Sequence, residues 1–218
     1  HRSGQPEVWL SQQGQVLQLS RFSQHSDIDS MIWSETGNQL YFVREQGLQA
    51  LTLDGQLTKI ETSFPILKVF QHLGDHKLLL SVVDDGAVKL VNFDINQASL
   101  TELYEGETEW AQMTEAGQVF RLDHNRRLHR VRQGASNELA LPYRVNGKFV
   151  YKQGQLFFFT RDNHLISYEV AEQKTKLWSL LSPKTRHLVV DSVDWHRGKL
   201  SYTHVHSFRK ELVKMALE

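Results

Sequence analysis

The chain has 218 residues, enough for one domain or two small ones, and its 25 Lys plus Arg balance its 25 Asp plus Glu. A formal charge of zero argues against a dedicated binder of nucleic acid or of an acidic membrane, which would need a basic surplus. The absence of cysteine excludes disulfides and thiolate chemistry, and a hydrophobic content of 40% argues against global disorder.

No stretch approaches the roughly 20 apolar residues that cross a bilayer. The sequence begins with His1 rather than Met, so we expect it to be part of a longer protein, with any signal peptide or membrane anchor upstream.

The first clear secondary-structure pattern runs from Ile28 to Glu61. Four short apolar or alternating runs are separated there by three turns that each contain glycine. None of the runs has the i, i+3, i+4, i+7 apolar spacing of a helix. The pattern predicts four antiparallel strands in succession.

The same pattern recurs along the chain. The turn after the first strand of each repeat holds a glycine, and successive glycines are 37, 43, 37 and 44 residues apart. These glycines are Gly37, Gly74, Gly117, Gly154 and Gly198. A strongly apolar second strand follows each of them, at residues 40–43, 77–83, 119–122, 156–160 and 200–205. Near-continuous apolar runs such as 78–83 are typical of strands buried on both faces. Fourth strands are expected at 57–61, 100–104, 138–143 and 176–181.

A four-stranded repeat of about 40–45 residues has the size of a β-propeller blade. We therefore predict an all-β, five-bladed β-propeller of four-stranded antiparallel blades that forms a single domain over residues 1–218. The predicted blades are residues 22–63, 64–106, 107–144, 145–182, and 183–218 together with 7–21. The N-terminal segment would thus close the ring, although it supplies one strand too many. Either the ends pair irregularly or more chain lies upstream.

The residues from Val8 to Leu53 resemble the repeat of TolB-type, WD40-like bacterial propellers. The turn Trp33-Ser34-Glu35-Thr36-Gly37 matches the family's W-S-P-D-G hairpin at Trp, Ser and Gly but lacks Pro-Asp. The second and fifth repeats match in part, and the third and fourth by spacing alone. The resemblance implies the fold and says little about function. Similar repeats also form the periplasmic sensory domains of ToxR/CadC-type membrane-anchored regulators. The resemblance therefore implies such a regulator as one setting for this chain.

Loops that enter the first strands of a propeller form one mouth of its axial channel, and polar residues at those places are candidate ligand contacts. They are Asp27, Asp29, Glu107, Glu109, Arg144, His187 and Asp191. Carboxylates from different blades, such as Asp29 and Glu109, could bind a cation or a sugar or act as a glycosidase pair. The alternative is that these acids cap turns and keep the loops solvated.

The segment Arg121 to Arg132 is rich in arginine. Arg126, Arg127, Arg130 and Arg132 are a candidate patch for an anion or an acidic partner, because guanidinium groups pair with carboxylate and phosphate. The alternative is a solvated hairpin whose charges prevent edge-to-edge aggregation. No aromatic residue interleaves with these arginines, which argues against nucleic-acid binding.

Eleven histidines could make the domain sensitive to acid, since imidazole titrates between pH 5 and 8. His72 and His76 flank one turn and could approach each other, whereas His204 and His206 would lie on opposite faces of a strand. Scattered surface and packed histidines are the alternative. No metal site is expected, and Trp33 and Trp195 are interpreted as packing between blades.

The sequence predicts a non-catalytic propeller that recognises a protein or a small ligand, needs no cofactor and does not itself bind nucleic acid. The most specific setting is the periplasmic sensory domain of a membrane-anchored bacterial transcriptional regulator, with membrane contact only through an upstream anchor. The alternatives are a free-standing TolB-like periplasmic interaction module and a small glycoside hydrolase.

Overall fold

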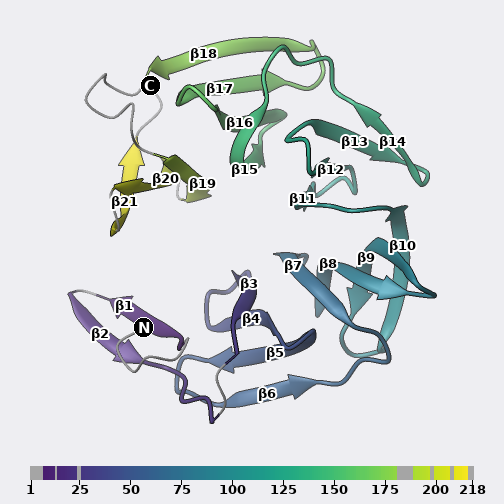
Figure 1. Ribbon diagram of the computed structural model, residues 1–218, viewed down its shortest axis with the longest axis vertical. Helices are drawn as coiled ribbons and strands as arrows, with labels where there is room; N and C mark the ends of the chain where they lie inside the picture. The colour runs from purple at the N-terminus through teal and green to yellow at the C-terminus, as the bar shows by residue number, and fades with distance from the viewer. Residues whose placement is uncertain are drawn as a thin grey trace. The chain divides into compact units, whose positions relative to one another are not determined.

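The computed structural model describes residues 7–12, 14–23, 26–180, 189–196, 199–206 and 209–215. These residues form 21 strands and no helix, which confirms the all-β prediction (Figure 1). Accordingly, the described residues contain no helix that could span a membrane. The chain divides into two compact units: residues 1–107 with 132–135, and residues 108–131 with 136–218. Each is described separately.

Unit 1 contains a hairpin and two four-stranded antiparallel sheets. The hairpin consists of β1 (Trp9–Gln12) and β2 (Gln15–Gln18). The first sheet consists of β3 (Ile28–Trp33), β4 (Gln39–Arg44), β5 (Gly47–Thr52) and β6 (Leu57–Ile60). The second consists of β7 (Ile66–His72), β8 (Lys77–Asp84), β9 (Ala87–Asp94) and β10 (Ser99–Glu105).

Unit 2 contains two further four-stranded sheets and a three-stranded one. The first consists of β11 (Trp110–Met113), β12 (Val119–Leu122), β13 (Leu128–Arg132) and β14 (Ala135–Glu138). The second consists of β15 (Val145–Lys152), β16 (Gln155–Thr160), β17 (His164–Glu169) and β18 (Lys174–Leu180). The third consists of β19 (Val189–His196), β20 (Lys199–His206) and β21 (Arg209–Met215).

Equivalent turns in different sheets use the same hydrogen bonds. Ser34 Oγ accepts the Gln39 amide proton at 3.1 Å, and Thr114 Oγ1 accepts that of Gln118 at 3.1 Å. In both turns the third residue after the hydroxyl is a glycine with positive φ, 72° at Gly37 and 76° at Gly117. A hydroxyl that replaces a backbone acceptor and a glycine that adopts a left-handed conformation are the usual means of closing a tight turn.

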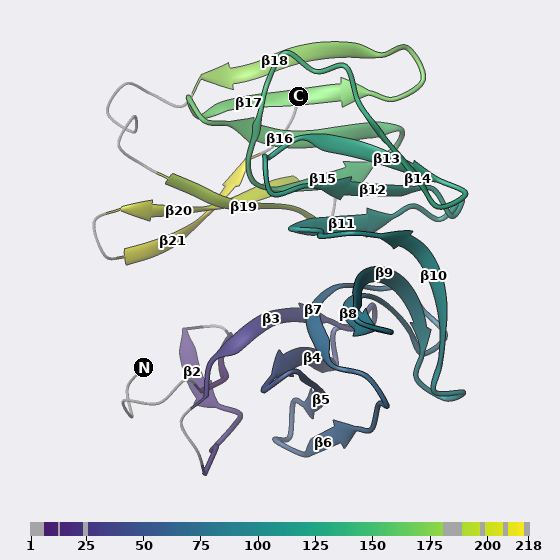
Figure 2. The ribbon, with the colours of Figure 1, turned by 45° about the vertical axis from the view of Figure 1, so that its right-hand side comes forward.

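The second strand of each four-stranded sheet is buried on both faces, as the sequence predicts. In β16, Leu156 and Phe158 pack toward the sheet β11–β14, while Phe157 and Phe159 pack toward the sheet β19–β21. The sheet β15–β18 lies beside β11–β14 in both ribbon views (Figures 1 and 2). In unit 1, Tyr41 and Val43 face one core cluster and Leu40 and Phe42 another. Alternate side chains of one strand therefore serve two different cores.

Neighbouring sheets within each unit contact each other through their first strands. The Val69 amide of β7 donates to Ser30 Oγ of β3 at 2.7 Å. In unit 2 the Tyr151 amide of β15 donates to Gln112 Oε1 of β11 at 2.7 Å. Both pairs are 39 residues apart in sequence. The repeat thus fixes both the strands of each sheet and the contact to the next sheet.

The four complete sheets coincide with the first four predicted repeats. The last repeat has three strands, and the N-terminal segment forms a two-stranded hairpin. That this hairpin completes a fifth blade stays a prediction. One strand prediction is wrong: residues 138–143 were expected as a fourth strand, but β14 spans Ala135–Glu138. Residues 139–144 form the loop into β15, where Pro142 could not donate a ladder hydrogen bond.

Candidate ligand site

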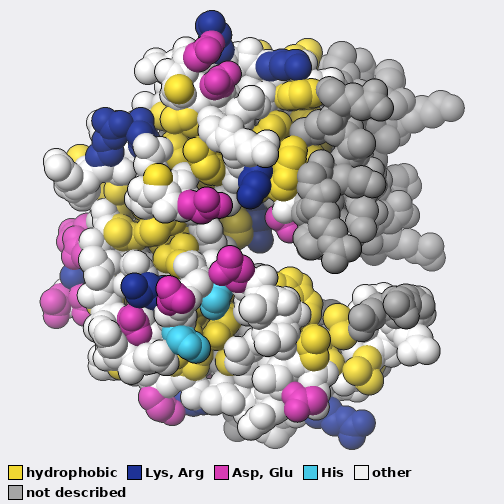
Figure 3. Space-filling model, turned by 180° about the vertical axis from the view of Figure 1, so that it is seen from behind, with side chains coloured by type: hydrophobic (Ala, Val, Ile, Leu, Met, Phe, Trp, Pro, Cys, Tyr) yellow, Lys and Arg dark blue, Asp and Glu magenta, His cyan; other side chains and the backbone are white. Residues whose placement is uncertain are grey.

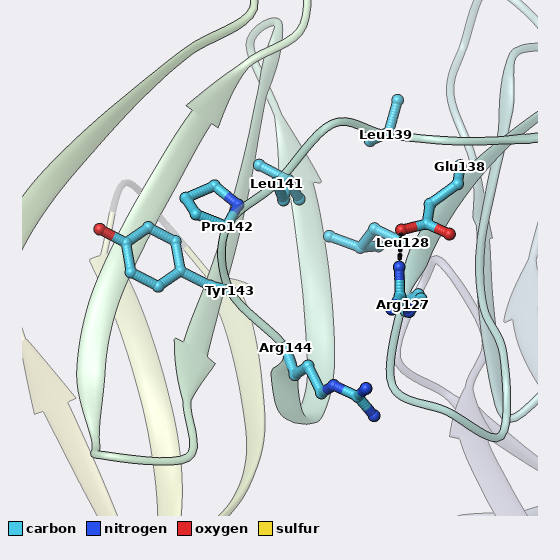
Figure 4. Close-up of a pocket in the computed structure, with 8 residues that line it drawn as sticks. All are labelled: Arg127, Leu128, Glu138, Leu139, Leu141, Pro142, Tyr143 and Arg144. Atoms are coloured by element: carbon cyan, nitrogen blue, oxygen red, sulfur yellow. Dashed lines mark hydrogen bonds and ion pairs between the residues drawn. The ribbon is translucent and has the colours of Figure 1, made fainter.

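An open pocket of about 110 Å³ lies in unit 2, where the chain passes from β14 into β15 (Figure 4). One side is formed by the β12–β13 turn and the start of β13, and the other by the segment that follows β14. The lining residues are Arg127, Leu128, Glu138, Leu139, Leu141, Pro142, Tyr143 and Arg144. The pocket therefore lies at a loop that enters a first strand, the location predicted for ligand contacts.

Backbone hydrogen bonds hold the two sides of the pocket together. The Leu139 amide donates to the Leu128 carbonyl at 2.8 Å, and the Leu141 amide donates to the Leu139 carbonyl at 2.7 Å. At the other end, the Val145 amide donates to the carbonyl of Arg126 at 3.0 Å. Leu139 and Leu141 also pack against the core cluster between the two sheets. The pocket wall is consequently continuous with a fixed hydrophobic core.

Two arginines form the charged rim of the pocket. Arg127 pairs with Glu138, and Arg144 Nη1 donates to the Asn125 carbonyl at 3.1 Å. In Figure 4 the side chain of Arg144 leaves the end of the loop on the side away from Leu139 and Leu141. Nearby, Arg126 Nη1 donates to the Gly147 carbonyl at 3.4 Å. The structure thus joins Arg144, a predicted mouth residue, with two members of the predicted arginine patch.

The turn that carries Arg127 is itself fixed by a half-buried carboxylate. Asp123 Oδ1 accepts the Arg127 amide proton at 2.8 Å, and Asp123 Oδ2 lies 3.1 Å from His129 Nε2. Burial opposes ionisation of Asp123, but the hydrogen bonds from Arg127 and His129 outweigh it and lower the pKa of that carboxyl. Asp123 therefore stays ionised and holds the turn in the conformation that presents Arg127.

The other two patch residues do not reach the pocket. Arg130 is half-buried on β13, and its charge opposes the burial that raises the pKa of Tyr168 on β17. Arg132 is exposed at the far end of β13 from Arg127. That Arg126, Arg127, Arg130 and Arg132 form a patch for an anion or an acidic partner stays a prediction.

The predicted acidic mouth is only partly described. Asp27, Asp29 and Glu107 are exposed, and Glu109 is half-buried, with its amide donating to the Leu122 carbonyl at 2.8 Å. Asp29 and Glu109 belong to different units, so a carboxylate pair between them stays a prediction. His187 lies outside the described residues, and of Asp191 only the backbone, in β19, is described. The described residues include no group of three His, Asp or Glu placed to hold a metal ion.

His72 links the two sheets of unit 1. Its Nδ1 accepts the Gly74 amide proton at 3.2 Å and that of Glu35 at 3.4 Å, and its ring stacks on Tyr41 with centroids 5.5 Å apart. Figure 3 shows a face on which histidine side chains lie among acidic ones. Burial lowers the pKa of His72; the Glu35 charge opposes this shift, and His76 adds to it. An unprotonated Nδ1 is required to accept the two amide protons.

We expect unit 1 to lose stability as the pH falls from 7.5 to 5.5. The pKa of His72 in the folded protein lies below its ordinary value near 6.5. Neutral His72 therefore contributes fully to the stability of unit 1 above about pH 6.5, and this contribution is lost as the pH falls through the folded-state pKa. His72→Asn retains an acceptor for the two amides but cannot titrate. Thermal melts at both pH values should show a smaller drop for this variant than for the parent. His124→Asn, at an exposed turn, is the control; equal drops in all three proteins would contradict the assignment.

The interpretation of Trp33 as packing between blades is wrong in part. Trp33 is 45% exposed on β3, and Met31, two positions earlier, is 46% exposed. Trp195, in contrast, packs against a core cluster as predicted.

Six residues of the pocket were not among the candidate site residues from the sequence. They are Leu128, Glu138, Leu139, Leu141, Pro142 and Tyr143. The alternating apolar pattern at 138–143 was interpreted as a strand, which concealed the loop. Pro142 was the available signal, since proline is disfavoured within a ladder.

Comparison with known proteins supports the fold. No protein-family model matches the chain, and a search of curated proteins found no match. Among solved structures, a TolB-like protein from Agrobacterium tumefaciens is similar with a TM-score of 0.68 and 11% identity, over 93% of this chain and 81% of that one. YCF48, solved with a D1 peptide, is similar with a TM-score of 0.60 and 11% identity, over 88% of this chain and 66% of YCF48.

The extracellular domain of a one-component system from B. thetaiotaomicron is also similar. Its TM-score is 0.61 at 15% identity, with 91% of this chain covered. This chain spans only 29% of that domain. Together the matches show that the fold is that of TolB-type, WD40-like β-propellers, which confirms the resemblance seen at Trp33-Ser34-Glu35-Thr36-Gly37.

Proposed function

We propose that this chain is a five-bladed recognition propeller without catalytic activity, which binds a small ligand or a protein segment at the pocket between β14 and β15. The observation that carries this proposal is the pocket itself. It is open, two of its lining residues, Leu139 and Leu141, pack on the core, and its lining includes Arg127 and Arg144 (Figure 4). Guanidinium groups at an open pocket can pair with carboxylate or phosphate groups of a ligand. YCF48 was solved with a bound peptide, so this fold is compatible with peptide recognition.

A ligand panel observed by NMR tests the proposal. The isotope-labelled protein is titrated with amino acids, dipeptides, short carboxylic acids and monosaccharides. We expect at least one class to cause saturable shifts of the amides of residues 124–128 and 138–144. A panel that leaves those amides unchanged, or shifts confined to other residues, would contradict recognition at this pocket.

We further propose that the domain is the periplasmic sensory part of a membrane-anchored bacterial transcriptional regulator. Its support is the similar fold of the extracellular domain of a one-component system. A free-standing periplasmic interaction module is the second candidate, favoured by the TolB-like protein of which this chain covers 81%. The coding sequence upstream of His1 separates the two. A winged helix followed by a membrane span supports the first, and a cleavable signal peptide directly upstream supports the second.

A further inference from the structure

Two arginine side chains tie the β12–β13 turn to the start of β15. Arg144 Nη1 donates to the Asn125 carbonyl of the turn at 3.1 Å, and Arg126 Nη1, from the turn, donates to the Gly147 carbonyl of β15 at 3.4 Å. The Val145 amide also donates to the Arg126 carbonyl at 3.0 Å. We call Arg126 and Arg144 the arginine clasp. Each guanidinium group is thus held in place by the backbone of the other segment.

The positive charges of the arginine clasp have no negative partner among the described residues. Both guanidinium groups donate to neutral carbonyls. The two acids of this region are engaged elsewhere, since Glu138 pairs with Arg127 and Asp123 accepts the amide proton of Arg127. A guanidinium group has five N–H donors in a planar fork, which fits the two oxygens of a carboxylate. Arg126 and Arg144 therefore keep donors for an anionic partner.

The exposure of the arginine clasp restricts the kind of anion that can bind. Arg144 is exposed and Arg126 is half-buried, and the pocket beside them is open, with a mostly polar surface. An exposed ion pair contributes a factor of about five or less to binding, so a single small anion would bind weakly. Carboxylates on one chain add their contributions, because the first to bind holds the next at a high local concentration. A segment with several acidic side chains therefore matches this surface best.

We propose that the arginine clasp binds an acidic segment of a partner protein, with one carboxylate on Arg126 and another on Arg144. The inference rests on the recognition function proposed above and specifies its partner. Complementary charge selects this partner, because a basic segment would be repelled by two cations that no described carboxylate neutralises. The bonds to the Asn125 and Gly147 carbonyls hold the cations in place before the partner arrives, which reduces the entropic cost of binding.

The first arm of the test uses three probes with the whole 218-residue chain. The peptide acetyl-Glu-Gly-Glu-Gly-Glu-amide supplies carboxylates, its glutamine counterpart removes only the charges, and inorganic phosphate is a single small anion. NMR titration at low salt is expected to show saturable shifts of the amides of residues 124–128 and 144–148 with the acidic peptide. The glutamine peptide should bind about tenfold more weakly, because two exposed ion pairs of about threefold each are lost. Added salt should weaken the acidic peptide and leave the glutamine peptide unchanged.

The second arm uses matched variants. Arg126→Gln and Arg144→Gln should each weaken the acidic peptide about threefold and leave the glutamine peptide unchanged. Arg144→Lys keeps the charge and should restore part of the loss. In the double variant the two peptides should bind equally. Arg161→Gln, at the exposed β16–β17 turn, should change neither affinity.

Three outcomes would overturn the inference of an acidic partner. They are equal affinity of the parent protein for the two peptides, tighter binding of phosphate than of the acidic peptide, and shifts of the pocket amides only with a compound of the earlier ligand panel. Each of them leaves the recognition function standing, because the pocket would still bind a ligand. If neither these probes nor the panel shift the pocket amides, both proposals fail.

Discussion

Replacing Phe158 with alanine is expected to lower the free energy of unfolding of unit 2 by about 3–5 kcal/mol, the usual cost of removing a fully buried phenylalanine. Phe158 is 0% exposed at the centre of β16. It packs with Phe120, Phe149 and Ile166 in the core that the sheets β11–β14 and β15–β18 share. The cavity left by the alanine would be lined by strands from both sheets, which hydrogen bonds hold in place, so it cannot collapse fully.

Denaturant unfolding followed by circular dichroism measures this loss, and hydrogen exchange of the β16 amides assigns it to unit 2. Leu177→Ala is the control, because Leu177 is 51% exposed on β18 and its removal should change stability by about 0.5 kcal/mol or less. If Phe158→Ala cost no more than Leu177→Ala, the packing of β16 between two sheets would be incorrect.

The burial of strands such as β16 was predictable because it is encoded by local pattern. A run of three or more consecutive apolar residues in a strand leaves no polar face for solvent, so both faces must be covered. The run from Phe157 to Phe159 meets this condition, and so does the run from Leu78 to Leu80. The closure of the turns was equally local, since Ser34 and Thr114 each lie three residues before a glycine, and each hydroxyl accepts an amide proton from a glutamine just after that glycine.

The fourth strands were less predictable, because an edge strand is defined by pairing rather than by composition. The segment Glu138 to Tyr143 alternates apolar residues as a strand would, yet Leu139 and Leu141 meet the core from a loop. Trp33 shows the converse. The position of Trp33 in the repeat suggests burial, but its side chain is exposed. Burial of a first strand depends on which other segment packs over it, and the local sequence pattern does not encode that packing.

The candidate site was predicted in pieces. The sequence assigned Arg144 to a mouth loop and Arg126 and Arg127 to a separate patch, because they lie 18 and 17 positions before Arg144. The bond from the Val145 amide to the Arg126 carbonyl brings the two segments together. That bond joins one sheet to the next, so it could be located only after the sheets were paired. The sequence therefore identified which residue types belong to the candidate site, but only the fold showed which of these residues lie together.

Replacing Phe22 with alanine should destabilise unit 1 by about 3 kcal/mol, at the lower end of the range for buried phenylalanine because the ring lies near the surface. Phe22 is 8% exposed and meets Phe42 edge-to-face with ring centroids 5.9 Å apart. The guanidinium of Arg44 lies 4.4 Å from the Phe22 ring centre, a cation–π contact that alanine would also remove. The Phe22 amide donates to Glu7 Oε1 at 2.9 Å, so the loss should spread to the N-terminal segment.

Two measurements separate this effect from a general loss of stability. Limited proteolysis should cut the N-terminal segment faster in Phe22→Ala than in the parent, since Val8 and Leu19 pack in the same cluster as Phe22. Phe22→Leu keeps an apolar side chain against Phe42 and should recover about half of the lost stability. A Phe22→Ala protein with unchanged unfolding and unchanged cleavage would show that the N-terminal segment does not dock on the sheet β3–β6. Docking of that segment is the first requirement of the predicted closure, because a hairpin that is free of its own unit cannot complete a blade.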